Sequence, residues 1–99
     1  MPKAIRVTEV GGPEVMKYVD VEVGPPGPGE VQVHHHAVGL NYIDIYHRSG
    51  LYPLPLPSGL GLEAAGVVEA VGAGVTEVQP GDRVAYAGGP VGAYSQSRC

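Results

Sequence analysis

The sequence predicts a mainly β fold, a small barrel or sandwich with one short helix. Short runs rich in Val, Ile and Tyr alternate apolar with polar residues, as half-buried strands do. The 16 glycines and 10 prolines recur between these runs, where they indicate turns. With 99 residues, 43% of them hydrophobic and 16% charged, the chain has the size and apolar content of one folded domain.

The first two strands are predicted at residues Ala4 to Val10 and Met16 to Val23. The first run places Ile5 and Val7 on one face, and a Gly-Gly-Pro sequence ends it. The second alternates apolar residues with charged ones, which gives it an exposed side. Residues 24–29 hold three prolines and three glycines, and we interpret them as a connecting turn because the next strand follows at once.

A third strand is predicted from Glu30 to Val38, and it contains His34, His35 and His36 in succession. Alternation along a strand sends neighbouring side chains to opposite faces. The three imidazoles therefore cannot converge on one metal ion, and we favour a structural role for them. We expect no metal site from this sequence.

The one convincing helix is predicted from Asn41 to Arg48. Tyr42, Ile45 and Tyr46 share one face at spacings of three and four residues. Asn41 is a favourable N-cap, and Asp44 stands where a capping box places its acid.

The second half of the chain is predicted to return to strands. The prolines between Tyr52 and Ser58 exclude a central strand and indicate a loop. Three further strands are expected, at Ala65 to Val71, Arg83 to Ala87 and Ala93 to Ser97, which makes six in all.

Charge and composition exclude several classes of partner. The net charge of −4 and the lack of a Lys/Arg cluster argue against nucleic acid. No apolar stretch is long enough to span a membrane, and the N-terminus lacks the features of a signal peptide. Cys99 is the only cysteine, so one chain can form neither a disulfide nor a cysteine-based zinc site. We expect a cytoplasmic protein.

One motif is a false dinucleotide fingerprint. Residues 59–64, Gly-Leu-Gly-Leu-Glu-Ala, match G-x-G-x-x-A. A true fingerprint follows a strand and opens a helix, so that the pyrophosphate meets free N–H groups. Here the motif follows a proline-rich loop and leads into a β-branched run, so we reject it. No segment supplies a βαβ unit, and no G-x-S-x-G elbow is present.

Six segments in order resemble the zinc-independent quinone oxidoreductases of the medium-chain dehydrogenase/reductase superfamily, the group that includes zeta-crystallin. They begin at residues 11, 28, 39, 48, 61 and 81 and read GGPEV, PGEV, GLNYID, RSGLYP, GLEAAGVV and GDRV. The resemblance runs essentially end to end. It implies a GroES-like, partly open β-barrel.

The resemblance also implies chemistry without zinc. Alcohol dehydrogenases of this superfamily hold a catalytic zinc with a cysteine and a histidine at places that are Asn41 and Leu62 here. Neither is a good zinc ligand. In the zinc-independent group NADPH passes a hydride to a quinone or another activated carbonyl, in a cleft between two domains.

By the same resemblance, Asn41, Tyr46 and Tyr52 are expected to line the cleft as catalytic residues, with Asn41 near the nicotinamide and the tyrosines near the acceptor. Their expected roles are positioning and polarisation. The helix is expected to pass beside the cofactor through the residues Asn41, Tyr42, Ile43, Asp44, Ile45 and Tyr46. The structural alternatives stay open: Asn41 as a plain cap, Tyr46 as a core aromatic and Tyr52 as a loop anchor. Glu63 receives no role.

Residues 1–99 are therefore expected to be an incomplete N-terminal catalytic domain, with the Rossmann NADPH-binding domain absent from this chain. The chain by itself is expected to be inactive. An uncovered sheet edge or apolar face predicts self-association into a homo-oligomer. The alternative is a free-standing GroES-like binding or assembly module without redox activity. An enone or an aldehyde could also replace the quinone as acceptor.

Overall fold

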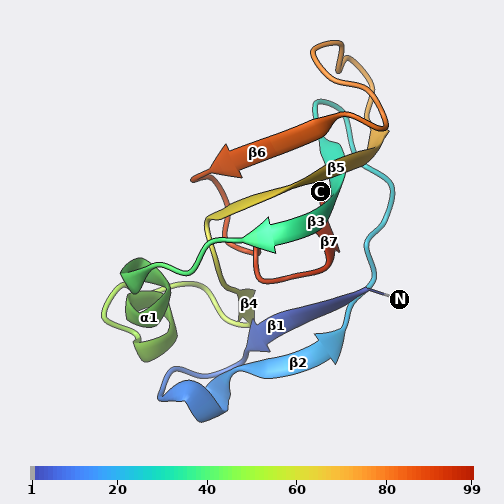
Figure 1. The fold of residues 1–99 in the computed structure, drawn as a ribbon. Coiled ribbons are helices and arrows are strands. Elements are labelled where there is room, and N and C mark those ends of the chain that lie inside the picture. The colour runs from blue at the N-terminus through green and yellow to red at the C-terminus, as the bar shows by residue number, and fades with distance from the viewer. Residues whose placement is uncertain (1) are drawn as a thin grey trace.

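The computed structural model describes residues 2–99, which form two antiparallel sheets and one α-helix (Figure 1). The helix lies at one end of the molecule, beyond the ends of the strands, and does not cover a sheet face. The prediction of a mainly β fold with one short helix is confirmed. Within these residues, no helix has both the length and the apolar character that crossing a membrane requires.

The smaller sheet has the strand order β2-β1-β4. Strand β1 (Lys3–Val7) pairs with β2 (Lys17–Asp20) and with the two-residue strand β4 (Ser58–Gly59). A 3-10 turn, η1 (Pro13–Val15), connects β1 to β2 and buries Val15. Val7, Val15 and Leu60 form the core cluster below this sheet, and Ile5, Met16 and Tyr94 pack against it.

The larger sheet has the order β6-β5-β3-β7. Its members are β3 (Val31–Val38), β5 (Glu63–Val71), β6 (Arg83–Ala87) and β7 (Ser97–Arg98). The β3–β5 pairing is the longest, and register shifts interrupt it twice. Gly66 of β5 lies against the carbonyl of His34, where a Cβ atom would overlap backbone. Only glycine allows β3 and β5 to approach so closely.

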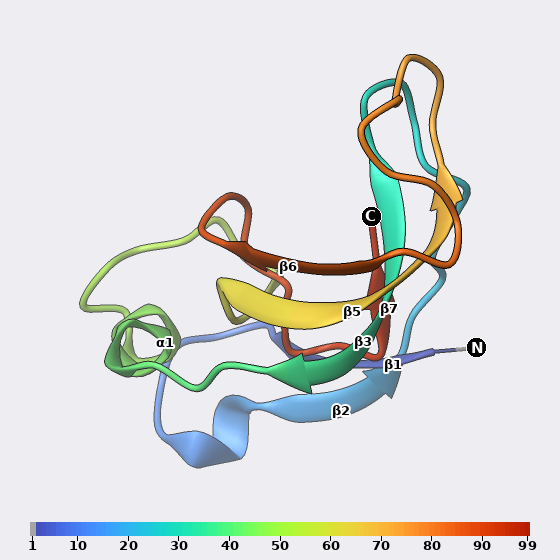
Figure 2. The ribbon, with the colours of Figure 1, turned by 45° about the horizontal axis from the view of Figure 1, so that its top comes forward.

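The two sheets meet along β1 and the segment just before β7. The Ile5 N–H donates to the Tyr94 carbonyl at 2.8 Å, and the Gln96 N–H donates to the Lys3 carbonyl at 2.8 Å. Between them, Ala4 and Ser95 form an isolated bridge. The strands bend around the core without closing into one continuous sheet (Figure 2), which confirms the expected partly open barrel.

Five of the six predicted strands are present, and each of their ends lies within three residues of the predicted position. The prediction of a strand from Ala93 to Ser97 was wrong, because Ser95 donates its N–H back to the Ala93 carbonyl at 2.7 Å in a turn. The strand there is Ser97–Arg98. Strand β4 was missed, since two residues after a proline-rich loop carry no periodic signal.

Candidate functional site

Helix α1 (Tyr42–Ser49) lies within one residue of the predicted bounds, Asn41 to Arg48. Asn41 has extended backbone angles at the N-cap, and its N–H donates to the Asp44 Oδ2 atom at 3.1 Å. This bond confirms the expected capping-box role of Asp44. At the other end Gly50 adopts φ of 88°, a left-handed conformation that stops the helix at low steric cost.

Asp44 also fixes the helix to the barrel. Its side chain is 3% exposed, and the Tyr94 hydroxyl donates to Oδ2 at 2.6 Å. Burial, reinforced by the hydrogen bond to Asp44, raises the pKa of Tyr94 well above its usual range. The second carboxylate oxygen, Oδ1, is buried without a hydrogen-bond partner in residues 2–99. Sequence reasoning missed Tyr94, because no local pattern links positions 50 residues apart.

The surface around α1 is unusually apolar. Six of the nine exposed large hydrophobic side chains among residues 2–99 lie between positions 40 and 56. We define the α1 surface as these six together with Tyr46: Leu40, Tyr42, Ile45, Tyr46, Leu51, Tyr52 and Leu56. Tyr42 is 78% exposed, so the face predicted from the helical spacing points away from the core. Because large exposed apolar patches are typical of binding sites, the α1 surface is the candidate binding surface.

Tyr46, His47 and Tyr52 form an aromatic cluster within this region. The Tyr46 and Tyr52 rings pack edge to face with centroids 5.4 Å apart, and the His47 ring lies 6.5 Å from that of Tyr52. The Tyr52 N–H donates to the Tyr46 carbonyl at 3.2 Å, which ties the loop to the helix. His47 Nδ1 is buried without a partner among residues 2–99. The two predicted tyrosines are therefore brought together, with His47 as a neighbour that the sequence did not single out.

The other predicted site residues lie along the same helix at different depths. Asn41, Ile43 and Tyr46 are half-buried, whereas Tyr42 and Ile45 are exposed. Asp44 faces inward, so its side chain holds the helix in position and does not contribute to the exposed surface of the helix. The structural role of Asn41 as a cap is confirmed, and the residue is half-buried at the start of the helix.

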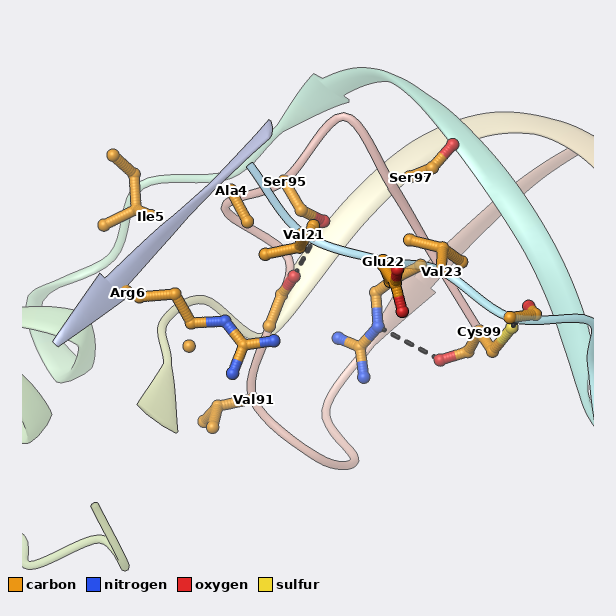
Figure 3. A pocket seen from close by; sticks show the side chains of 14 residues that line it. Ala4, Ile5, Arg6, Val21, Glu22, Val23, Val91, Ser95, Ser97 and Cys99 are labelled. Carbon is orange, nitrogen blue, oxygen red and sulfur yellow. Dashed lines mark hydrogen bonds between the residues drawn. The ribbon is translucent and has the colours of Figure 1, made fainter. Parts of the chain in front are cut away.

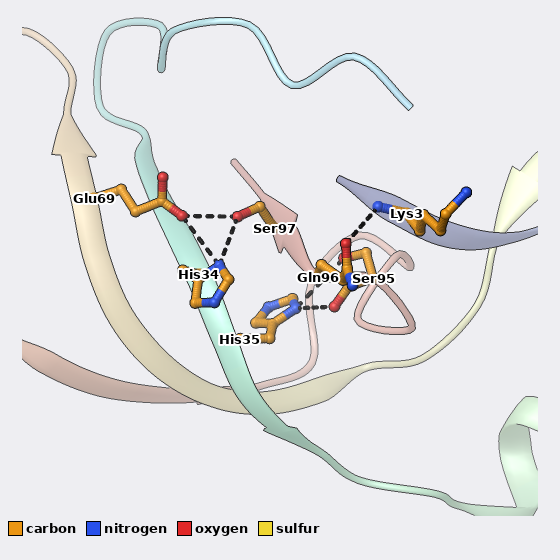
Figure 4. Close-up of polar contacts among 7 residues, drawn as sticks. All are labelled: Lys3, His34, His35, Glu69, Ser95, Gln96 and Ser97. Atoms are coloured by element: carbon orange, nitrogen blue, oxygen red, sulfur yellow. Dashed lines mark hydrogen bonds and ion pairs between the residues drawn. The ribbon is translucent and has the colours of Figure 1, made fainter. Parts of the chain in front are cut away.

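His34 and His35, neighbours on β3, have different hydrogen-bond partners, as alternation predicts (Figure 4). His35 Nδ1 donates to the Ser95 carbonyl at 2.8 Å, so Nε2 is the acceptor of the Tyr86 hydroxyl at 2.9 Å. Burial lowers the pKa of His35. His34 turns instead to Glu69 and Ser97. The motif at residues 59–64 begins in the two-residue strand β4 and leads into β5, so the helix that a dinucleotide fingerprint opens is replaced by a strand.

A hollow of about 290 Å³ lies elsewhere, between β1 and residues 21–24 (Figure 3). Arg6, Glu22, Arg98 and Cys99 line it, and none of the predicted site residues does. The predicted residues lie instead on α1 and the loop that follows it, where Tyr42, Ile45 and Tyr52 are exposed.

Comparison with known proteins agrees with this arrangement. The family described as the alcohol dehydrogenase GroES-like domain matches residues 27–99. A quinone oxidoreductase of Pseudomonas aeruginosa is 61% identical over 97 residues, which cover 97% of this chain and 30% of that protein. A 2-haloacrylate reductase from a Burkholderia species is 46% identical over 103 residues and is covered to 31%.

Among solved structures, the Escherichia coli quinone oxidoreductase complexed with NADPH superposes with a TM-score of 0.93 at 51% identity. The match covers 96% of this chain and 29% of that one. The chain thus spans about 30% of the length of the curated relatives it matches. From its fold and these matches, the chain belongs to the alcohol dehydrogenase GroES-like domain family and resembles the N-terminal part of its quinone oxidoreductases.

Proposed function

We propose that residues 1–99 form the acceptor-binding part of an NADPH-dependent quinone reductase. The observation that carries this proposal is the α1 surface, where the paired rings of Tyr46 and Tyr52 belong to a segment rich in exposed apolar side chains. A quinone is a flat, mostly apolar molecule with two carbonyl oxygens. Aromatic and aliphatic side chains with a few hydroxyl groups are what such a ligand needs.

The residues of α1 also suit a nicotinamide ring. Tyr42 and Ile45 expose apolar area to one side of the helix, while the half-exposed Asn41 amide can donate to a carboxamide or accept from one. We assign the cofactor contacts to Asn41 and to the outward residues of the segment from Tyr42 to Tyr46. Asp44, buried beneath them, holds this segment in place through Tyr94.

When bound, NADPH supplies a hydride, and a quinone that gains the hydride and one proton becomes a hydroquinone. Negative charge grows on the quinone oxygen during this change. The hydroxyls of Tyr46 and Tyr52 have no hydrogen-bond partner within residues 2–99, so either is free to donate to that oxygen. Their role is to orient the acceptor and stabilise this charge, and the proton can come from the phenol or from solvent.

We propose that this chemistry proceeds without zinc. The positions that hold catalytic zinc in related alcohol dehydrogenases are occupied by Asn41 and Leu62, a helix cap and an aliphatic side chain. Among residues 2–99, no group of three or more His, Cys, Asp or Glu side chains has an arrangement that could hold a metal ion. The donor set at α1 therefore does not fit the metal.

The dinucleotide itself would be held by a Rossmann domain outside residues 1–99, because the described strands are joined without a βαβ unit. Alone, the domain is expected to be inactive. We further propose a cytoplasmic protein that associates with copies of itself through β6, which pairs on one side only among residues 2–99. A species that stays monomeric across a concentration series in light scattering would contradict the association.

A chimera tests the proposed function. Residues 1–99 replace the matching segment of the Pseudomonas aeruginosa quinone oxidoreductase, with which they share 61% identity. The chimera should oxidise NADPH in the presence of 1,4-benzoquinone, and a chelator should not slow it. The isolated 99-residue chain should show no turnover under the same conditions.

Two results would count against the proposal. Turnover by the isolated chain would mean that it assembles a cofactor site without a second domain. An inactive chimera that is folded and still binds NADPH would favour the alternative, a binding or assembly module without redox activity. Turnover with 2-haloacrylate or an aldehyde in place of benzoquinone would keep the hydride chemistry and change the acceptor.

A further inference from the structure

We propose that His34 and His36 form a surface site for a divalent transition-metal ion, separate from the α1 surface. Both side chains are exposed and come from the same face of β3, two residues apart. Their ring centroids lie 5.6 Å apart, with an angle of 86° between the ring planes. Imidazole is a preferred ligand of Zn²⁺, Ni²⁺ and Cu²⁺.

The spacing of the two rings suits a shared ion. A zinc ion lies about 2.1 Å from a ligating imidazole nitrogen, hence roughly 3.2 Å from the ring centroid. For tetrahedral coordination, two such centroids are then separated by roughly 5.2 Å. The observed 5.6 Å differs by an amount that small side-chain rotations can remove. The distance between the two rings is therefore compatible with binding of one ion.

Glu69 supplies the second observation. Its Oε1 atom lies 3.4 Å from His34 Nδ1, and the buried Ser97 hydroxyl donates to the same oxygen at 2.8 Å. A carboxylate at Nδ1 favours the tautomer with its proton on that nitrogen, which leaves the Nε2 lone pair for a metal. Histidine ligands in metalloproteins are commonly oriented by such a carboxylate. Figure 4 shows His34, Glu69 and Ser97 grouped on one side of the strand, away from His35.

The site offers two protein nitrogens, and solvent would complete the coordination. It should therefore bind weakly compared with a four-ligand structural zinc site and should follow the usual order, with Cu²⁺ tightest, Mn²⁺ weakest and no uptake of Mg²⁺. His35 is excluded from it, because both of its ring nitrogens are engaged with Ser95 and Tyr86.

Calorimetric titration of the 99-residue chain with Zn²⁺ tests the proposal. All variants carry Cys99→Ser, so that the exposed thiol cannot bind the ion. We expect one ion per chain, and His36→Gln should weaken binding by at least tenfold. Glu69→Gln should weaken it by about tenfold, within the range seen when a carboxylate that orients a ligand is removed.

His35→Gln is the matched control, since it removes an imidazole from the adjacent position and should leave zinc affinity unchanged. If that variant does not fold, as judged by circular dichroism, His47→Gln replaces it. In NMR spectra of the imidazole nitrogens, zinc should shift His34 and His36 and leave the other two rings unmoved. Equal zinc affinity in the parent and His36→Gln, or shifts confined to His35 or His47, would overturn the proposal.

Discussion

Replacement of Tyr94 by Phe removes the hydroxyl that joins α1 to the barrel. This hydroxyl donates to Asp44 Oδ2 at 2.6 Å, and Asp44 is 3% exposed. A hydrogen bond to a charged group contributes about 1.5–3 kcal/mol. Asp44 Oδ1 already lacks a partner among residues 2–99, so Tyr94→Phe leaves the Asn41 N–H as the remaining donor to this carboxylate. We therefore expect a loss of about 2 kcal/mol in the free energy of unfolding.

Urea denaturation and thermal melting at pH 7 measure this loss. For a domain of this size, 2 kcal/mol corresponds to a decrease in Tm of about 10 °C. The matched control is Tyr86→Phe, which removes a hydroxyl that donates to the neutral His35 ring at 2.9 Å. It should cost about 1 kcal/mol, because the acceptor carries no charge. A Tyr94→Phe cost equal to or smaller than the control would refute the idea that a buried, charged acceptor holds the helix.

Three further predictions concern pH and packing. Because the pKa of Tyr94 is raised in the folded state, the unfolded chain loses this proton first, and the free energy of unfolding should fall as pH rises above about 10. In urea titrations, Tyr94→Phe should make this fall smaller. Because the pKa of His35 is lowered in the folded state, the unfolded chain takes up a proton first as pH falls below about 6.5. The free energy of unfolding should therefore decrease from pH 7.5 to 5.5, and the decrease should be smaller in His35→Gln. Leu60 is 1% exposed in the core cluster, and Leu60→Ala should cost about 3 kcal/mol by urea denaturation; a cost below 1 kcal/mol would contradict its placement.

Local sequence signals were sufficient for most of the fold. Alternation found β3, β5 and β6, and the N-cap Asn41 marked the start of α1. These signals depend on a few neighbouring residues, so they can be read without knowing what packs against them. The arrangement of β1, β4 and the segment before β7 could not be found in this way. It depends on contacts between residues far apart in the sequence, such as the pairing of Arg6 with Gly59 and the hydrogen bond from Gln96 to Lys3.

The candidate site, like the fold, could be predicted from the sequence only in part. Tyr46 and Tyr52 were proposed from a family resemblance, and the structure places their rings in contact. The helical stripe of Tyr42 and Ile45 could not be distinguished from a core-facing stripe by spacing, since periodicity gives the face and not what lies opposite it. The role of Tyr94 could not be predicted from the sequence for a different reason, because it depends on one long-range hydrogen bond to a buried carboxylate.

The most direct test of the proposed function compares kcat for 1,4-benzoquinone reduction in the chimera and in its Tyr46→Phe/Tyr52→Phe variant. The control is Tyr18→Phe, which alters a 61% exposed tyrosine on β2, outside the α1 surface. If the paired phenols stabilise the developing charge, the double variant should lose at least tenfold in kcat while Tyr18→Phe keeps the parental value. Equal kcat in all three proteins, each shown to be folded and to bind NADPH, would contradict the assignment of the acceptor site to Tyr46 and Tyr52.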